Sequence, residues 1–268
     1  MSLIVAYIGV DKPNRKNGIA SMCFGADSRI SWDPNAVEKC DSAQKIFYST
    51  CFPEMFAYCG MVAFPQHVLP QLVRRIDTGT LATAEMGSDE KLNYVVEFIQ
   101  EHLGAYQPSG VKNDCIILYG TKHRSRYALY KITINGNNIR IEKVPLDLVS
   151  GVVCCEGSGA MEFKNQLSHV GNTNEANTTR GIYHCLLCTI LNSKTPTVGG
   201  MMQVAGLYRG SQSPKELGII CQGERYVGGQ RVEYVEALNN LEWRDESFQR
   251  VDPKTMTLLE GAQAQPFI

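Results

Sequence analysis

The sequence lacks several features that would assign it to a broad class of proteins. It has no run of Lys or Arg long enough to follow a phosphate backbone or an anionic bilayer, and its 26 basic and 27 acidic residues leave a formal net charge of -1. It has no apolar run approaching the roughly 18 residues of a membrane span, and no secretory signal pattern. These absences argue against nucleic-acid and membrane partners, and we expect a soluble, cytoplasmic protein.

Metal-ligand patterns are also weak, although the chain has 10 cysteines. Two clusters are candidates: Cys154 with Cys155, and His184, Cys185 and Cys188 within a helical pattern. A structural zinc site normally takes two ligand pairs from turns at defined spacing, and the second pair is missing. We therefore expect free thiols, buried as small apolar side chains in a reducing compartment, with no metal and no cofactor.

The order of the expected elements predicts the fold. Apolar runs predict strands over 2–8, 19–25, 43–48, 55–59, 115–119, 127–134 and 138–144, a strand ending at 157, and strands near 201–208 and 217–221. Helical periodicity predicts helices over 66–76, from an N-cap at Ser88 to Leu103, over about 160–169 and over about 174–191. This order is typical of two stacked antiparallel sheets with a helix pair on each outer side, a four-layer αββα sandwich of the α+β class.

The length of 268 residues allows a sizeable core without disulfides or metals, and no internal repeat or low-complexity tract is evident. We expect a single domain over residues 1–268, with a mostly polar C-terminal extension from about residue 243.

The N-terminus carries the most informative chemistry. Removal of Met1 is favoured when the next side chain is small, and Ser2 then carries a free α-amine beside its hydroxyl. An α-amine titrates near pH ~7.7 to 8.0, so it can take the hydroxyl proton, directly or through one water. Ser2 is equally compatible with an ordinary first strand residue, so the hypothesis depends on the residues that follow.

Four short motifs follow Ser2 in a particular order. They are Ala26-Asp27-Ser28-Arg29, Gln44-Lys45-Ile46, Tyr58-Cys59-Gly60 and Gly157-Ser158-Gly159. Together they resemble proteasome β-type subunits and bacterial proteasome-like peptidases, which are N-terminal nucleophile hydrolases. The resemblance implies the four-layer fold, peptide or protein substrates and assembly into a homo-oligomeric ring, and it leaves open an unfoldase or cap partner.

Each residue type has a physical role in such a site. A cationic Lys45 beside the Ser2 amine and hydroxyl favours their deprotonated forms, and Asp27 keeps that lysine charged and aimed. Gly60 lets a substrate carbonyl approach the main chain, so that its N–H stabilises an oxyanion. The resemblance makes Ser158 a proton relay near the amine, whereas a plain helix N-cap is the alternative interpretation. Taken singly, Asp27, Lys45 and Gly60 also fit a strand exit, a solvated strand position and a turn.

The sequence departs from that family at several points. The nucleophile is Ser where Thr is usual, and the first turn is longer. Active members carry an Asp shortly before a Ser-Gly-Gly, whereas residues 195–200 read Thr-Pro-Thr-Val-Gly-Gly. Asn192 or Ser193 is a candidate for the missing hydrogen bond.

We therefore expect a peptidase or amidohydrolase that uses Ser2 through an acyl-enzyme. The missing carboxylate favours an alternative, a catalytically inactive ring or scaffold subunit of the same fold. A small-molecule amidase or a peptide ligase on the same fold is a further alternative, because the site chemistry is indifferent to what lies beyond the scissile bond.

Overall fold

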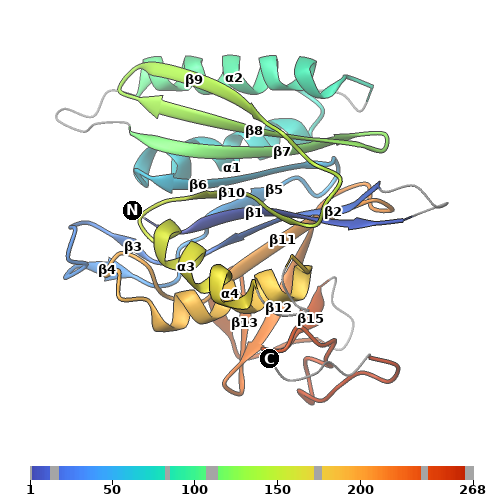
Figure 1. Ribbon diagram of the computed structural model, residues 1–268. Coiled ribbons are helices and arrows are strands. Elements are labelled where there is room, and N and C mark those ends of the chain that lie inside the picture. The colour runs from blue at the N-terminus through green and yellow to red at the C-terminus, as the bar shows by residue number, and fades with distance from the viewer. Residues whose placement is uncertain are drawn as a thin grey trace.

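Two large β-sheets and four helices make up the described part of the computed structural model, which is residues 2–12, 18–81, 85–106, 114–171, 177–236 and 241–262 (Figure 1). Within each sheet the strands pair antiparallel, apart from one parallel contact at β12. The predicted α+β class is confirmed.

The larger sheet contains the N-terminal strand. Its strands in spatial order are β10 (Gly151–Glu156), β1 (Ile4–Asp11), β2 (Gly18–Ala26), β11 (Gln203–Tyr208), β12 (Lys215–Cys221), β13 (Glu224–Val227) and β14 (Gln230–Val232), and β15 (Glu242–Arg244) pairs with β12. In β1 the side chains of Val5 and Tyr7 face the helical layer beside this sheet, whereas those of Ile4 and Ala6 face the other sheet. Burial on both faces explains the uninterrupted apolar run at the start of the chain.

The second sheet provides the opposite wall of the core. Its strands in spatial order are β5 (Ile46–Tyr48), β6 (Glu54–Gly60), β7 (Cys115–His123), β8 (Arg126–Asn135) and β9 (Asn138–Val144). Two short strands, β3 (Ile30–Ser31) and β4 (Lys39–Cys40), form a separate two-stranded sheet. Along β6, Met55 and Ala57 face the first sheet, whereas Phe56 and Tyr58 face the helices. Successive side chains of β6 therefore point to opposite faces of the sheet, as they do in a regular β-strand.

Two helix pairs cover different sheets. Helices α1 (Ala63–Asp77) and α2 (Ser88–Ala105) contribute to an apolar cluster with the five-stranded sheet, and α3 (Ala160–Val170) and α4 (Thr179–Asn192) contribute to a cluster with the larger sheet. In Figure 1, α2 lies along the outer side of β8 and β9, and α3 lies beside α4. A third cluster contains side chains from both sheets.

Some predicted boundaries are wrong. Ser88 is the first residue of α2 and not its N-cap, because the extended residue Gly87 occupies the cap position without a side-chain hydrogen bond. Helix α4 begins at Thr179, where Thr178 accepts a hydrogen bond from the Gly181 N–H, and residues 174–176 lie outside the described residues. Helix α1 begins three residues earlier than predicted and continues through Pro70.

The segment after residue 240 is attached to the larger sheet. Trp243 lies in β15 and is 3% exposed, and it forms a small apolar cluster with Ile220 and Val251. Among the described residues, no helix combines the length and the apolar character that crossing a membrane requires.

Candidate active site

Asp27 lies at the centre of a buried hydrogen-bond network at the end of β2. One carboxylate oxygen accepts from the Leu3 N–H at 2.9 Å and from the Lys45 ammonium at 2.6 Å. The other oxygen accepts from the N–H groups of Arg29 and Gly199 at 3.2 and 3.1 Å. The side chain therefore joins the N-terminal strand to the segments that carry Lys45 and Gly199, and its acceptor positions are satisfied.

Lys45 is fully buried, as is its partner Asp27, and both side chains are 0% exposed. Burial lowers the pKa of Lys45, while the adjacent Asp27 carboxylate acts in the opposite direction. The Lys45 main-chain N–H donates to the Gln203 side-chain oxygen at 2.9 Å, and the Gln203 amide nitrogen donates to the Ala43 carbonyl at 2.7 Å. Gln203 thus fixes the segment from which Lys45 projects into the site.

Ser158 contacts the main chain of Ser2. The Ser2 N–H donates to the Ser158 hydroxyl oxygen at 3.0 Å, and the Gly159 N–H donates to the Ser2 carbonyl at 3.1 Å. The Ser158 hydroxyl also lies 2.8 Å from the hydroxyl of Thr197. The N-cap alternative for Ser158 is wrong, because α3 has Gly159 at its cap position and no side-chain cap.

Gly60 ends β6 with a backbone that favours glycine. Its φ is +95°, and a Cβ there would lie 2.8 Å from the Asp114 carbonyl oxygen. The Tyr58 N–H donates to the Lys45 carbonyl, on the β5 side of β6. Because alternate N–H groups of a strand point to the same edge, the Gly60 N–H also points to the side on which Lys45 lies.

The segment over residues 193–200 is held by two charged side chains. Arg29 donates to the carbonyls of Pro196 and Val198 and pairs with Asp41. Glu162 of α3 accepts hydrogen bonds from the side chains of Ser193 and Thr195 and from the Lys194 N–H.

The two residues considered for the missing hydrogen bond point elsewhere. Ser193 donates to Glu162, and the Asn192 amide donates to the Cys188 carbonyl of its own helix. The neighbour of Ser158 is instead Thr197, a residue for which the sequence offers no distinguishing signal.

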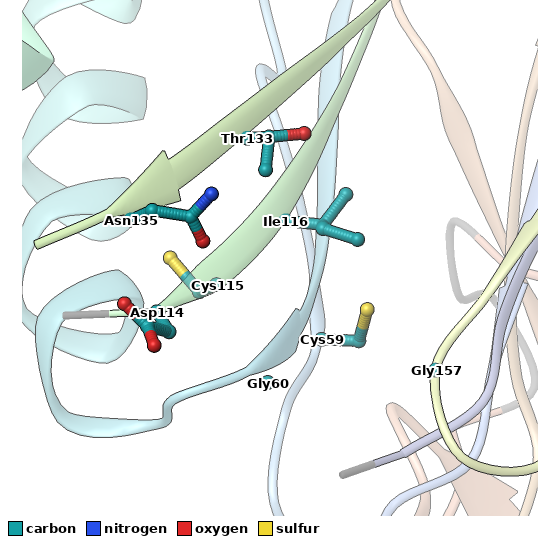
Figure 2. A pocket seen from close by; sticks show the side chains of 8 residues that line it. All are labelled: Cys59, Gly60, Asp114, Cys115, Ile116, Thr133, Asn135 and Gly157. Atoms are coloured by element: carbon teal, nitrogen blue, oxygen red, sulfur yellow. The ribbon is translucent and has the colours of Figure 1, made fainter. Parts of the chain in front are cut away.

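A pocket of about 260 Å³ lies between Gly60 and Gly157 (Figure 2). Ile116 of β7 and Thr133 of β8 are directly opposed in the sheet, and both side chains point toward the side on which Gly157 lies. Gly157 abuts the candidate nucleophile, since a Cβ there would meet the Ser2 carbonyl oxygen at 2.2 Å. The pocket is therefore next to the N-terminal strand.

Two cysteines line the same pocket, Cys59 and Cys115 (Figure 2). Burial raises the pKa of each thiol to about 12. Both therefore remain protonated at neutral pH and are weak nucleophiles.

The cysteine clusters have ordinary contacts. The Cys188 sulfur lies 3.4 Å from the His184 Nε2, and Cys154 donates to Glu156. Within the described ranges, no group of three or more His, Cys, Asp and Glu side chains is arranged to hold a metal ion.

The predicted residues thus meet around the Ser2–Leu3 peptide. Asp27 accepts from the Leu3 N–H and pairs with Lys45, Ser158 accepts from the Ser2 N–H, and Gly60 directs an N–H to the side on which Lys45 lies. Gln203 and Thr197 complete the network and were not predicted. No protein family and no curated protein matches the sequence, so any functional assignment depends on the residues and their geometry.

Proposed function

We propose that this protein is an N-terminal serine hydrolase with the proteasome-like fold, which cleaves peptide or other amide bonds after Met1 has been removed. The observation that carries the proposal is the fully buried Asp27–Lys45 ion pair bonded to the peptide that follows Ser2. Burying an ion pair costs desolvation free energy, so a buried pair needs an explanation. Here the pair lies one peptide from a terminus that carries a hydroxyl, where its charges can act on the chemistry of that terminus.

In this mechanism the Ser2 hydroxyl oxygen attacks the carbonyl carbon of the scissile amide, and the Ser2 α-amine takes the hydroxyl proton. The Gly60 N–H stabilises the oxyanion, and the positive charge of Lys45 favours the unprotonated amine. The C–N bond then breaks, the proton passes to the departing amine, and the acyl group remains as an ester on Ser2. Water hydrolyses that ester and regenerates the hydroxyl.

Ser158 has the geometry of a relay in this scheme. Its hydroxyl accepts from the nitrogen that becomes the α-amine, at 3.0 Å, and is itself 2.8 Å from the Thr197 hydroxyl. Two hydroxyls in series can orient the amine lone pair and carry its proton toward the leaving group.

The arrangement of apolar clusters supports the proposed fold family. One cluster contains residues of both sheets, and each remaining large cluster contains one sheet and its helix pair. We assign these to the four layers of an αββα sandwich in one domain over residues 1–268. A homo-oligomeric ring in the cytoplasm, with an unidentified cap or unfoldase, is part of the same proposal.

A non-catalytic ring or scaffold subunit is the second candidate. Ser2 is 1% exposed, so in the uncleaved chain its hydroxyl has almost no access to solvent. If Met1 is retained, Ser2 has no free amine and the site is a structural junction. A small-molecule amidase or a peptide ligase would use the same residues, and these candidates differ from a peptidase in what the pocket admits.

The test begins with the intact mass of protein purified from cells. We expect a species that begins at Ser2, and turnover of a panel of fluorogenic peptide amides that the Ser2→Ala variant loses. Full retention of Met1, or equal turnover by the two proteins, would exclude the hydrolase and favour the scaffold.

A further inference from the structure

A second cavity lies at the opposite end of the sheets from Gly60. It has a volume of about 550 Å³, within the range of small-molecule sites. Its walls come from the segment before β6, from the end of β7 with the following turn, and from the segment after β11. In the β6–β7 ladder Glu54 pairs with Thr121 at this end and Gly60 pairs with Cys115 at the other, so the two sites are separated by the length of the sheet.

The charges that line this cavity are all positive. Lys122, Arg124 and Arg209 contribute to its walls, and its lining includes no Asp or Glu side chain. Lys122 is 6% exposed, and its ammonium donates to three main-chain carbonyls, those of residues 208, 209 and 211, at 2.6 to 3.1 Å. These neutral acceptors satisfy its hydrogens but leave its charge without a counterion.

The two arginines differ in what they already bind. Arg209 forms a two-pronged ion pair with Asp11 and also donates to the carbonyls of residues 18 and 19. Arg124 makes no hydrogen bond or ion pair with another described residue. Arg124 lies in the two-residue turn between the paired residues His123 and Arg126, where its φ is +56°. The turn places it in the wall of the cavity.

Nearby carboxylates do not neutralise the cavity. Asp11 is engaged by Arg209, and Asp77 accepts hydrogen bonds from Ser49 and Thr50. Neither side chain lines the cavity. Lys122 and Arg124 therefore supply positive charge that no lining carboxylate offsets. Among the described residues the Lys122 ammonium has only neutral neighbours, the three carbonyls and the Tyr127 ring 5.8 Å away, and burial lowers its pKa.

We propose that this cavity is a binding site for a small phosphorylated ligand, whose phosphoryl group is bound by Arg124 and neutralises the charge of Lys122. The guanidinium of Arg124 can donate paired N–H hydrogen bonds to two phosphate oxygens. The negative charge of the phosphoryl group would also be the counterion that the Lys122 ammonium lacks. The site is independent of the chemistry proposed at Ser2.

The experiment is calorimetric titration of inorganic pyrophosphate into the full chain, with inorganic phosphate as a smaller probe. We expect one site per chain, and Arg124→Gln is expected to weaken binding about tenfold or more, the usual value of a charge-assisted hydrogen bond. Arg140→Gln, an exposed arginine on β9, is the matched control and leaves the affinity unchanged. Ser2→Ala also leaves it unchanged, which separates this site from the candidate active site.

Ionic strength provides a second measurement. Raising it from about 0.01 to about 0.15 M shortens the Debye length from about 30 to about 8 Å, and the affinity for pyrophosphate falls. Absence of binding by both probes overturns the proposal. Equal weakening by Arg124→Gln and Arg140→Gln also overturns it, because that result indicates diffuse attraction to the surface and not a built site.

Discussion

At the scale of single residues, the candidate site is organised by the charge balance between Asp27 and Lys45. Each is buried with no exposed side-chain surface, and each is the counterion of the other. Removing one partner leaves an uncompensated charge in the core, which is far more costly than losing an exposed pair. The network is therefore accessible to stability measurements that do not require a substrate.

Lys45→Met is expected to reduce the free energy of unfolding by about 3–5 kcal/mol, because Asp27 then remains buried without a cation. The matched control is Lys143→Met, which breaks a pair with Asp89 whose side chains are 58% and 75% exposed. That change is expected to cost less than about 1 kcal/mol. Urea denaturation measures both, and equal costs would contradict the account of the buried pair.

Thr197→Val tests the hydroxyl series at the proposed relay. It keeps the shape of a side chain that is 3% exposed but removes the hydroxyl beside Ser158. We expect kcat to fall about tenfold, the value of one hydrogen bond, with KM unchanged. Thr197→Ser is expected to restore kcat, whereas a loss of kcat in both variants would assign Thr197 a packing role.

At the scale of elements, the site is built where strands end. Asp27 follows β2, Lys45 precedes β5, Gly60 ends β6, and Ser158 lies between β10 and α3. Residues just outside a ladder have N–H and C=O groups that are not committed to a neighbouring strand. They are therefore able to bond one another and a substrate.

Gly60→Ala tests the end of β6. The new Cβ would be held at φ +95° and would lie 2.8 Å from the Asp114 carbonyl, so we expect a loss of about 2–4 kcal/mol. Gly79→Ala is the control, because Gly79 has φ +67° and open space around it, and about 1 kcal/mol is expected. Thermal unfolding compares them, and a Gly79 cost as large as that of Gly60 would contradict the close approach.

The sequence predicted the long elements because their burial follows a simple period. The expected strand over 55–59 lies within β6, and the expected helix from 88 to 103 lies within α2. Strands β3, β4, β13 and β14 were missed because they are short and mostly exposed or half-buried, so pairing and not apolar periodicity defines them.

The candidate site was predictable where several short motifs occur together in a particular order. Asp27 and Lys45 were singled out by the order of the motifs that follow Ser2, and Ser158 by the family resemblance. Gln203 and Thr197 were not, because a neutral side chain that bonds a segment tens of residues away leaves no local pattern.

At the scale of the whole molecule, the C-terminal segment packs on strand β12 of the larger sheet. Trp243 of β15 packs on Gly218 of β12, where a Cβ would lie 2.4 Å from the indole. The expected polar extension thus contains a buried aromatic anchor. The strand on which it packs, β12, is the neighbour of β11, which carries Gln203.

The two tryptophans of the chain provide a matched pair. Trp243→Ala is expected to cost about 3–5 kcal/mol, as for other large-to-small core changes. Trp32→Ala is expected to change stability by no more than about 0.5 kcal/mol, because Trp32 is 66% exposed. Circular dichroism during denaturation measures both variants, and a small effect of Trp243→Ala would mean that the C-terminal segment does not contribute to the fold.

The most direct test of the hydrolase proposal is covalent labelling by a peptide that carries an electrophilic warhead, located by mass spectrometry of proteolytic fragments. We predict one adduct per chain, on the N-terminal fragment that begins at Ser2, and no adduct in the Ser2→Ala variant. The Lys45→Met variant, measured under conditions in which it is folded, is expected to be labelled much more slowly. An adduct that persists in Ser2→Ala, or one located on Cys59 or another thiol, would contradict the assignment of Ser2 as the nucleophile.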